Sequence, residues 1–333
     1  MNWFERLTGF AEESYPHTLQ QLHVADGCLH SRVNGASWPV GRLSTPSLAE
    51  LRSQTQAIRA KLTGDLIVRN VVEDAYELHA RSNARGALIQ VASQFNLLEM
   101  VHPDISPEHG VAGYEHDLTQ GPACARAAGA GTIYRNYFAP VGDQCGQTEH
   151  GQINTFADLC RALPGAEGVQ MRNGYALIEQ ASLERMAAHL AQASEAERDT
   201  LRELLRIGLH EDVLVTVPGA AQGQTLTQAY CSALPVSYNR TGTLRHLWEP
   251  LARLVLEAAY EATLHAALLN AARTHNPRVY LTFLGGGAFG NDRAWILDAI
   301  RRALACMRGV ALEVNLVSYQ RPAPDVVDML THG

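Results

Sequence analysis

The sequence predicts an α/β fold in which a mixed sheet lies between two layers of helices. Short apolar segments rich in β-branched residues alternate with amphipathic segments of helical length along most of the 333 residues. Right-handed helical crossovers usually return a chain to the same sheet, so this alternation favours parallel or mixed strands with helices on both faces. A hydrophobic content of 46% is sufficient for a substantial core.

The order of the predicted elements supports this class. The first sixty-two residues are expected to form an N-terminal helical cap, with a helix over 47–62 that starts at a serine. Residues 63–333 are expected to form the α/β domain. The predicted strands of that domain are 64–70, 86–95, 132–141, 213–219, 225–236, 278–284 and 311–319, and the predicted helices are 71–82, 119–131, 246–272 and 292–307.

One segment interrupts the alternation and is predicted to be an insertion. Residues 164–210 are predicted to contain a hairpin, with Asn173-Gly174 as its turn, and two helices with exposed charged faces. Its role is left open, between shaping substrate access and covering the sheet.

Composition excludes several classes of protein. A formal net charge of -7 and a pI near 6.0 argue against a broad surface for nucleic acid or anionic lipid. The N-terminus has no secretory pattern and no segment is apolar enough to span a membrane, so a cytoplasmic location is expected. Six cysteines without a C-x-x-C pair indicate reduced thiols, and no histidine or cysteine cluster has zinc-ligand spacing. Neither a metal nor a cofactor is expected.

The stretch "LTFLGGGAFGND", at the end of the predicted strand 278–284, is the strongest local signal of a binding site. Ligands of open α/β sheets bind beyond the carboxyl ends of the strands, and glycines there let backbone N–H groups converge on an anion. We therefore expect a phosphate-binding loop. The alternative is a tight turn whose glycines merely allow close packing. The Walker pattern is absent, and "GGGAFG" lies too near the C-terminus for an ordinary dinucleotide-binding strand.

Residues 64–320 resemble a macrodomain, the family of ADP-ribose-binding and ADP-ribosyl-hydrolysing domains. The similarity lies in "RVYLTFLGGGAFGND", its following helix and the strand "LEVNLVSY", which resemble the macrodomain loop around the diphosphate and distal ribose. "GALIQVASQFN" is similar to the strand ending in N-A-A-N. The resemblance implies ligand contacts from Asn96, Phe95, Gly285, Gly286, Gly287, Ala288, Phe289, Gly290 and Asn291. Loop bracing by Asn96 and core packing by Phe95 and Phe289 are the alternatives.

The segment "YEHDLTQGPACARAAGAG" stands where macrodomains have their catalytic loop, although it departs from the G-G-G-V-x-x-A-I pattern. Glu115 and Asp117 point to the same side if the chain is extended, and carboxylates stabilise an oxocarbenium-like state and orient water. We predict Glu115, Asp117 and Gln120 as catalytic residues and Thr119 as a ligand contact. Helix capping by Asp117 and Thr119 is the alternative.

These observations predict an ADP-ribosyl hydrolase that acts on a modified protein side chain, with ADP-ribose and ADP-ribosylated protein as partners. The chain looks most similar to macrodomains that act on arginine-linked ADP-ribose, and carboxylates suit a guanidinium leaving group. A non-catalytic ADP-ribose-binding module and an enzyme acting on a free nucleotide are the alternatives. The target protein, the linkage and the oligomeric state are left open.

Overall fold

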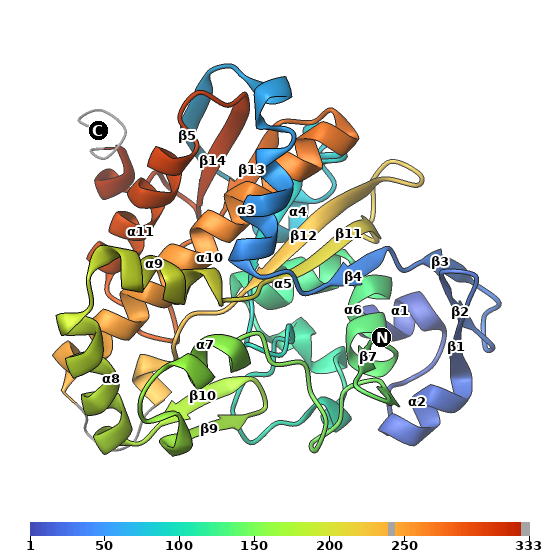
Figure 1. Ribbon diagram of the computed structural model, residues 1–333. Helices are drawn as coiled ribbons and strands as arrows, with labels where there is room; N and C mark the ends of the chain where they lie inside the picture. Colours follow the sequence, from blue (N-terminus) through green and yellow to red (C-terminus); the bar gives the residue numbers. More distant parts are fainter. Residues whose placement is uncertain (239–243, 328–333) are drawn as a thin grey trace.

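A computed structural model describes residues 1–238 and 244–327. Its centre is a seven-stranded sheet of order β4-β11-β12-β6-β13-β14-β5 (Figure 1). The strands are β4 (Arg42–Ser44), β11 (Gly208–Leu214), β12 (Thr225–Cys231), β6 (Leu88–Ala92), β13 (Arg278–Leu281), β14 (Leu312–Ser318) and β5 (Leu66–Val72). The five strands from β12 to β5 are parallel, whereas β11 and β4 extend the sheet in antiparallel pairs. The predicted mixed sheet is therefore confirmed.

Helices cover both faces of this sheet, which confirms the three-layer α/β/α arrangement. Helices α3 (Leu48–Gln56), α10 (Arg245–Thr274) and α11 (Arg293–Cys306) pack on one face, where Leu88 of β6 joins their core cluster. Helices α5 (Gln120–Ala127) and α6 (Gly129–Tyr137) pack on the other, where Ile89 of the same strand contributes. Neighbouring residues of β6 enter opposite cores because side chains alternate along a strand.

The N-terminal 62 residues are not purely helical, so this part of the prediction is wrong. Besides α1 (Trp3–Thr8), α2 (Tyr15–Gln21) and η1 (Arg59–Leu62), they contain β1 (Leu22–Ala25), β2 (Cys28–Ser31) and β3 (Ser37–Pro39), which form a separate antiparallel sheet. Asp26 and Gly27 both have positive φ, at 50° and 72°, as a two-residue hairpin turn requires. Strand β4 joins the main sheet, so this segment is integrated with the α/β domain.

The segment predicted as an insertion contains η5 (Ala166–Gly168), β9 (Val169–Arg172), β10 (Tyr175–Ile178), α8 (Gln180–Gln192) and α9 (Glu195–Glu203). The hairpin turn at Asn173-Gly174 is confirmed, with φ of 46° and 81°. Strand β11 begins at Gly208, earlier than the predicted strand 213–219, so the end of the predicted insertion already belongs to the main sheet.

Two predicted elements between β5 and the insertion are wrong. Of the predicted strand 132–141, residues 132–137 lie in α6, because Ile133 and Tyr137 lie one helical turn apart and both enter a core cluster. The predicted helix 71–82 is only α4 (Ala75–Leu78), because Val71 and Val72 continue β5. The remaining short elements are η2 (Ser82–Ala84), η3 (Pro107–His109), η4 (Ala112–His116), β7 (Pro140–Val141), β8 (Gln144–Cys145), α7 (Ala157–Ala162) and η6 (Val236–Tyr238).

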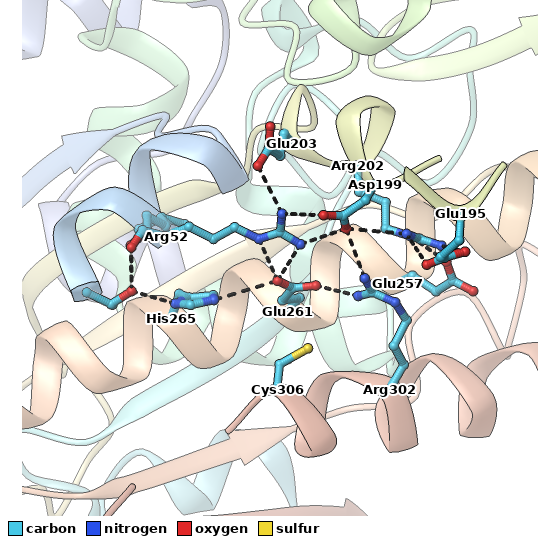
Figure 2. Close-up of polar contacts among 12 residues, drawn as sticks. Arg52, Glu195, Asp199, Arg202, Glu203, Glu257, Glu261, His265, Arg302 and Cys306 are labelled. Carbon is cyan, nitrogen blue, oxygen red and sulfur yellow. Dashed lines mark hydrogen bonds and ion pairs between the residues drawn. The ribbon is translucent and has the colours of Figure 1, made fainter. Parts of the chain in front are cut away.

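A cluster of charged side chains links α3, α9, α10 and α11 (Figure 2). Glu261 of α10 is 3% exposed at its side chain and accepts hydrogen bonds from Arg52 and Arg302, which reach it from α3 and α11. Asp199 of α9 accepts from the same two arginines. This cluster links the four helices of one layer through buried and half-buried ion pairs.

No helix within the described ranges is long and apolar enough to cross a membrane. All six cysteines are unpaired, and Cys124 and Cys231 are buried.

Candidate active site

A cavity opens at the carboxyl ends of the parallel strands β6, β12 and β13, where the sequence predicts a ligand. Its volume is about 710 Å³. We call it the main cavity. A second one of about 510 Å³, the side cavity, lies at the ends of β5 and β14. The two share the lining residues Leu118, Gln120, Thr282 and Phe283, so they are adjoining chambers of one cleft. An extended ligand with two dissimilar ends fits such a shape.

The loop between β13 and α11 forms one wall of the main cavity. Gly285, Gly287, Ala288 and Phe289 line it. Within the described ranges, the backbone N–H groups of these four residues donate to no protein acceptor. Gly285 has φ of 69°, a conformation that glycine adopts without strain. Successive free amides on a cavity wall are the donors that an anionic group such as a phosphate needs.

The other predicted members of this loop hold it in shape. Asn291 is 4% exposed, and its side-chain amide donates to the carbonyl of Leu234 at 2.8 Å, so it braces the loop. The Gly286 and Gly290 amides close turns within the loop, to Phe283 and Gly287. These three residues are not part of the cavity lining, and ligand contact by them stays a prediction. The N-terminus of α11 is also occupied, because Asp292 caps it through the amide of Ala294 at 2.9 Å.

Asp117 also lines the main cavity, on the segment that leads into α5. Its Oδ1 accepts from the amide and the hydroxyl of Thr119, at 2.8 and 2.7 Å. Its Oδ2 has no partner among the described residues. Thr119 also lines the cavity, but its hydroxyl donates a hydrogen bond to Asp117. Thus one carboxylate oxygen fixes the turn and the other is left for a ligand or water.

Gln120 lines both cavities, yet its amide is fully engaged by the protein. Its Oε1 accepts from the amide of Ala92 at 2.9 Å, and its Nε2 donates to the carbonyl of Gln90 at 2.8 Å. These bonds fasten the start of α5 to the end of β6. Gln120 is therefore a structural link between α5 and β6, and its catalytic role stays a prediction.

Glu115 does not line either cavity within the described residues. Its carboxylate accepts from the backbone N–H of Trp3 and from Arg6 at 3.1 Å. Burial raises the pKa of Glu115, but these two hydrogen bonds outweigh it and leave the pKa below its ordinary value. Residues 112–116 form the 3₁₀ helix η4 rather than an extended chain, so the predicted pairing of Glu115 with Asp117 on one side is not formed.

Asn96 and Phe95 also lie outside the cavity lining. Asn96 is fully buried, accepts from the amide of Leu98 at 3.1 Å and donates to Gln152 at 2.9 Å. Phe95 packs in the core against Phe156, with ring centroids 5.0 Å apart. The alternatives of loop bracing and core packing are therefore correct for this pair, and ligand contact is not.

Sequence reasoning missed Glu99, the most deeply buried carboxyl of the main cavity. It is 4% exposed, and its Oε1 has no hydrogen-bond partner in the described part of the chain. Burial raises its pKa well above the ordinary value, Arg135 opposes this, and the negative charge of Asp117 adds to it. A lone acidic residue in the apolar run "FNLLEMV" is the signal that could have found it, since unpaired acids are rarely buried.

Aromatic side chains line both chambers. In the main cavity Tyr175, Tyr238 and Phe289 contact one another, with ring centroids 5.1 to 5.6 Å apart. In the side cavity the guanidinium of Arg293 lies 3.7 Å above the ring of Phe283. Flat apolar surfaces of this kind suit a sugar or a planar base.

The described residues do not favour metal-ion chemistry or nucleophilic attack by a cysteine thiol. No group of three or more His, Cys, Asp or Glu side chains there is arranged to hold a metal ion. Cys231 lines the main cavity, but burial raises the pKa of its thiol to about 12, so it is a poor nucleophile at neutral pH.

No protein-family model matches the chain, and no curated protein matches it. Among solved structures it is similar to poly(ADP-ribose) glycohydrolase from Deinococcus radiodurans in complex with ADP-ribose, with 12% identity over 86% of this chain and 90% of that chain and a TM-score of 0.46. It is also similar to the glycohydrolase from Thermomonospora curvata, with 15% identity, 91% of each chain covered and a TM-score of 0.42.

Proposed function

We propose that the protein is an ADP-ribosyl hydrolase that releases ADP-ribose from a modified protein side chain. The observation that carries the proposal is the composition of the main cavity, in which a wall of free backbone amides at Gly285 and Gly287–Phe289 shares one chamber with the carboxyl groups of Asp117 and Glu99. Amides suit a diphosphate, and carboxyl groups suit an oxocarbenium-like sugar carbon. ADP-ribose carries both groups in one molecule.

The adjoining chamber supports a nucleoside at the other end of the ligand. Phe283 lines both chambers and its ring contacts the guanidinium of Arg293, and Glu73 and Asp74 also line the side cavity. An aromatic surface with nearby acceptors suits a planar base that carries an amino group. The proposal therefore places the base in the side cavity and the distal ribose in the main cavity.

Arginine is the proposed attachment residue. Asp117 keeps one carboxylate oxygen, Oδ2, without a protein partner in the described ranges, and a carboxylate is the preferred partner of a guanidinium. Ion pairing with the leaving guanidinium would favour arginine over serine or glutamate linkages, which carry no positive charge at the bond that breaks. Asp117 would then be the residue that selects arginine-linked ADP-ribose over the other linkages.

One experiment tests the activity and the linkage together. A protein ADP-ribosylated at arginine, and matched proteins modified at serine or glutamate, are incubated with the enzyme, and released ADP-ribose is measured by mass spectrometry. We expect release from arginine at least tenfold faster than from the other two. Equal release from all three would overturn the linkage, and no release from any would overturn the activity.

The second candidate is an ADP-ribose-binding module without hydrolysis. It is favoured by the hydrogen bonds of Asp117 Oδ1 and Gln120, which give these polar groups structural roles. Calorimetric titration with ADP-ribose, AMP and NAD measures binding apart from cleavage. Tight ADP-ribose binding combined with no release from any modified protein would select this candidate.

A further inference from the structure

A second carboxyl group faces the proposed ligand, on a part of the chain remote from Asp117. Glu99 lines the main cavity while being 4% exposed, and it takes part in no ion pair among the described residues. A buried carboxyl with an unused oxygen costs stability, because burial removes water without supplying a partner. Functional sites tolerate such a cost, so a buried carboxyl group without a partner indicates a functional role.

The loop that carries Glu99 is held in a strained shape from several directions. Leu97 has φ of 65°, which is unfavourable for a residue with a branched side chain. Its carbonyl accepts from Nε of Arg135 at 3.2 Å, and the carbonyl of Asn96 accepts from Gln147 at 3.0 Å. The amide of Glu99 itself donates to the hydroxyl of Tyr114 at 2.9 Å. The backbone at Glu99 is therefore fixed by tertiary contacts.

The surroundings make room for the carboxyl but supply no counter-ion. Position 121 is a glycine, and a Cβ there would lie 2.2 Å from Oε2 of Glu99, so the missing side chain leaves space for this group. The buried Arg135 is engaged elsewhere, by the carbonyl of Leu97, by Thr132 and by His210. The titratable and charged groups that influence or surround Glu99 are Arg135, Asp117, Tyr114, Cys124, Tyr175 and Tyr230.

We propose that Glu99 is the proton donor of the hydrolysis, with Asp117 as the base. This inference rests on the proposed function. As the bond between C1 of the distal ribose and the side-chain heteroatom breaks, its electron pair goes to the heteroatom, which takes the proton of Glu99. After the released side chain has left Oδ2 of Asp117, this oxygen removes a proton from water, and the water oxygen bonds to C1. Solvent then carries the proton from Asp117 back to Glu99, so ADP-ribose and the free side chain are the products.

Two carboxyl groups in one cavity suit this division because their environments differ. Glu99 is buried and has no partner, which favours the neutral acid, whereas Asp117 is partly exposed and accepts two hydrogen bonds at Oδ1, which favours the carboxylate. Environments that separate an acid from a base in this way are the usual arrangement in enzymes that hydrolyse glycosidic bonds.

The variant Glu99→Gln tests the proposal, with Glu115→Gln as a matched control whose carboxylate lies outside the cavity. We expect kcat of Glu99→Gln to fall by about 100-fold or more, as for loss of a general acid, and its ADP-ribose affinity to stay within about twofold. The fall in kcat at alkaline pH, which deprotonation of Glu99 causes in the wild type, should be absent from Glu99→Gln. Glu115→Gln should keep wild-type kcat and profile.

A second measurement does not depend on activity. Infrared difference spectra of wild type minus Glu99→Gln at pH 7 should contain the band of a protonated carboxyl group, and its absence would overturn the proposal. So would a Glu99→Gln enzyme with wild-type kcat and an unchanged alkaline limb. If wild type itself releases no ADP-ribose from any substrate, the proposed function fails, and the infrared band then decides only the protonation state of Glu99.

Discussion

Substitution of Glu261 by Gln should destabilise the protein far more than its position, remote from the cleft, would suggest. The side chain of Glu261 is 3% exposed and accepts from Arg52 at 2.7 Å and from Arg302, while His265 lies 3.6 Å away (Figure 2). Gln has nearly the same shape but no charge. The substitution therefore leaves two guanidinium groups beside a neutral amide.

The size of the effect follows from burial and from what remains. Removing one partner of a buried ion pair costs about 3–5 kcal/mol. Asp199 still accepts from Arg52 and Arg302, so we expect the lower end, about 3 kcal/mol. For 333 residues, an unfolding entropy of about 2.1 cal/mol/K per residue gives about 0.7 kcal/mol/K, so Tm should fall by about 4 °C.

Glu249→Gln is the matched control on the same helix. Glu249 pairs with Arg253 at 2.7 Å, but the two side chains are 41% and 29% exposed. Surface pairs contribute about 0–1 kcal/mol, so Tm should fall by about 1 °C or less. Calorimetric melting of the three proteins at pH 7 measures both differences. Equal Tm values for the Glu261 and Glu249 variants would refute the reasoning that burial sets the cost.

The same comparison has a predicted pH dependence. Burial raises the pKa of Glu261, but hydrogen bonds from His265, Arg52 and Arg302 outweigh it, so the pKa lies below 4.5 in the folded protein. A depressed folded pKa contributes stability that is present above 4.5 and is lost as the pH falls through the folded value. The Tm difference between wild type and Glu261→Gln should therefore narrow in melts performed below pH 4.5.

Three further outcomes are expected at the site. Gly285→Ala places a Cβ 2.5 Å from the side chain of Ala233 at a φ of 69°, so the affinity for ADP-ribose should fall at least tenfold. Gly35→Ala has a φ of 70° and no close neighbour, so it should not change this affinity. Calorimetric titration measures both. Asn96→Ala removes two buried hydrogen bonds and should cost about 2 kcal/mol in denaturant unfolding, which full stability would contradict. Glu115→Gln should release ADP-ribose at the wild-type rate. A large loss of this activity would show that Glu115 takes part in catalysis.

Much of the sheet could be predicted because its signals are local. The strands β12, β13 and β14 and the helices α10 and α11 lie where apolar runs and helical periodicity place them. The hairpin turn at Asn173-Gly174 follows from residues that tolerate positive φ. The glycine loop also lies at the carboxyl edge of the sheet as predicted, because a loop that joins a parallel strand to the following helix begins at the carboxyl end of that strand.

Other elements were decided by contacts that a local pattern does not contain. The β-branched and aromatic residues of 132–137 predict a strand, yet they form a helix because Ile133 and Tyr137 meet the core of the N-terminal segment. Asn96 and Gln120 are amides predicted to lie at the site. In the structure Asn96 bonds to the backbone N–H of Leu98 and to the side chain of Gln152, and Gln120 bonds to backbone groups of β6.

By itself, the sequence determined the layered α/β class, the glycine loop at the strand ends and the presence of acidic groups before α5. Only the tertiary structure decided which acids enter the cavity. Glu115 is drawn to the N-terminal helix by Trp3 and Arg6, while Glu99 is held over Gly121 by a loop that Arg135 fastens. The reason is physical: the protonation and access of a carboxyl group depend on its burial and its partners, and these come from residues distant in the chain.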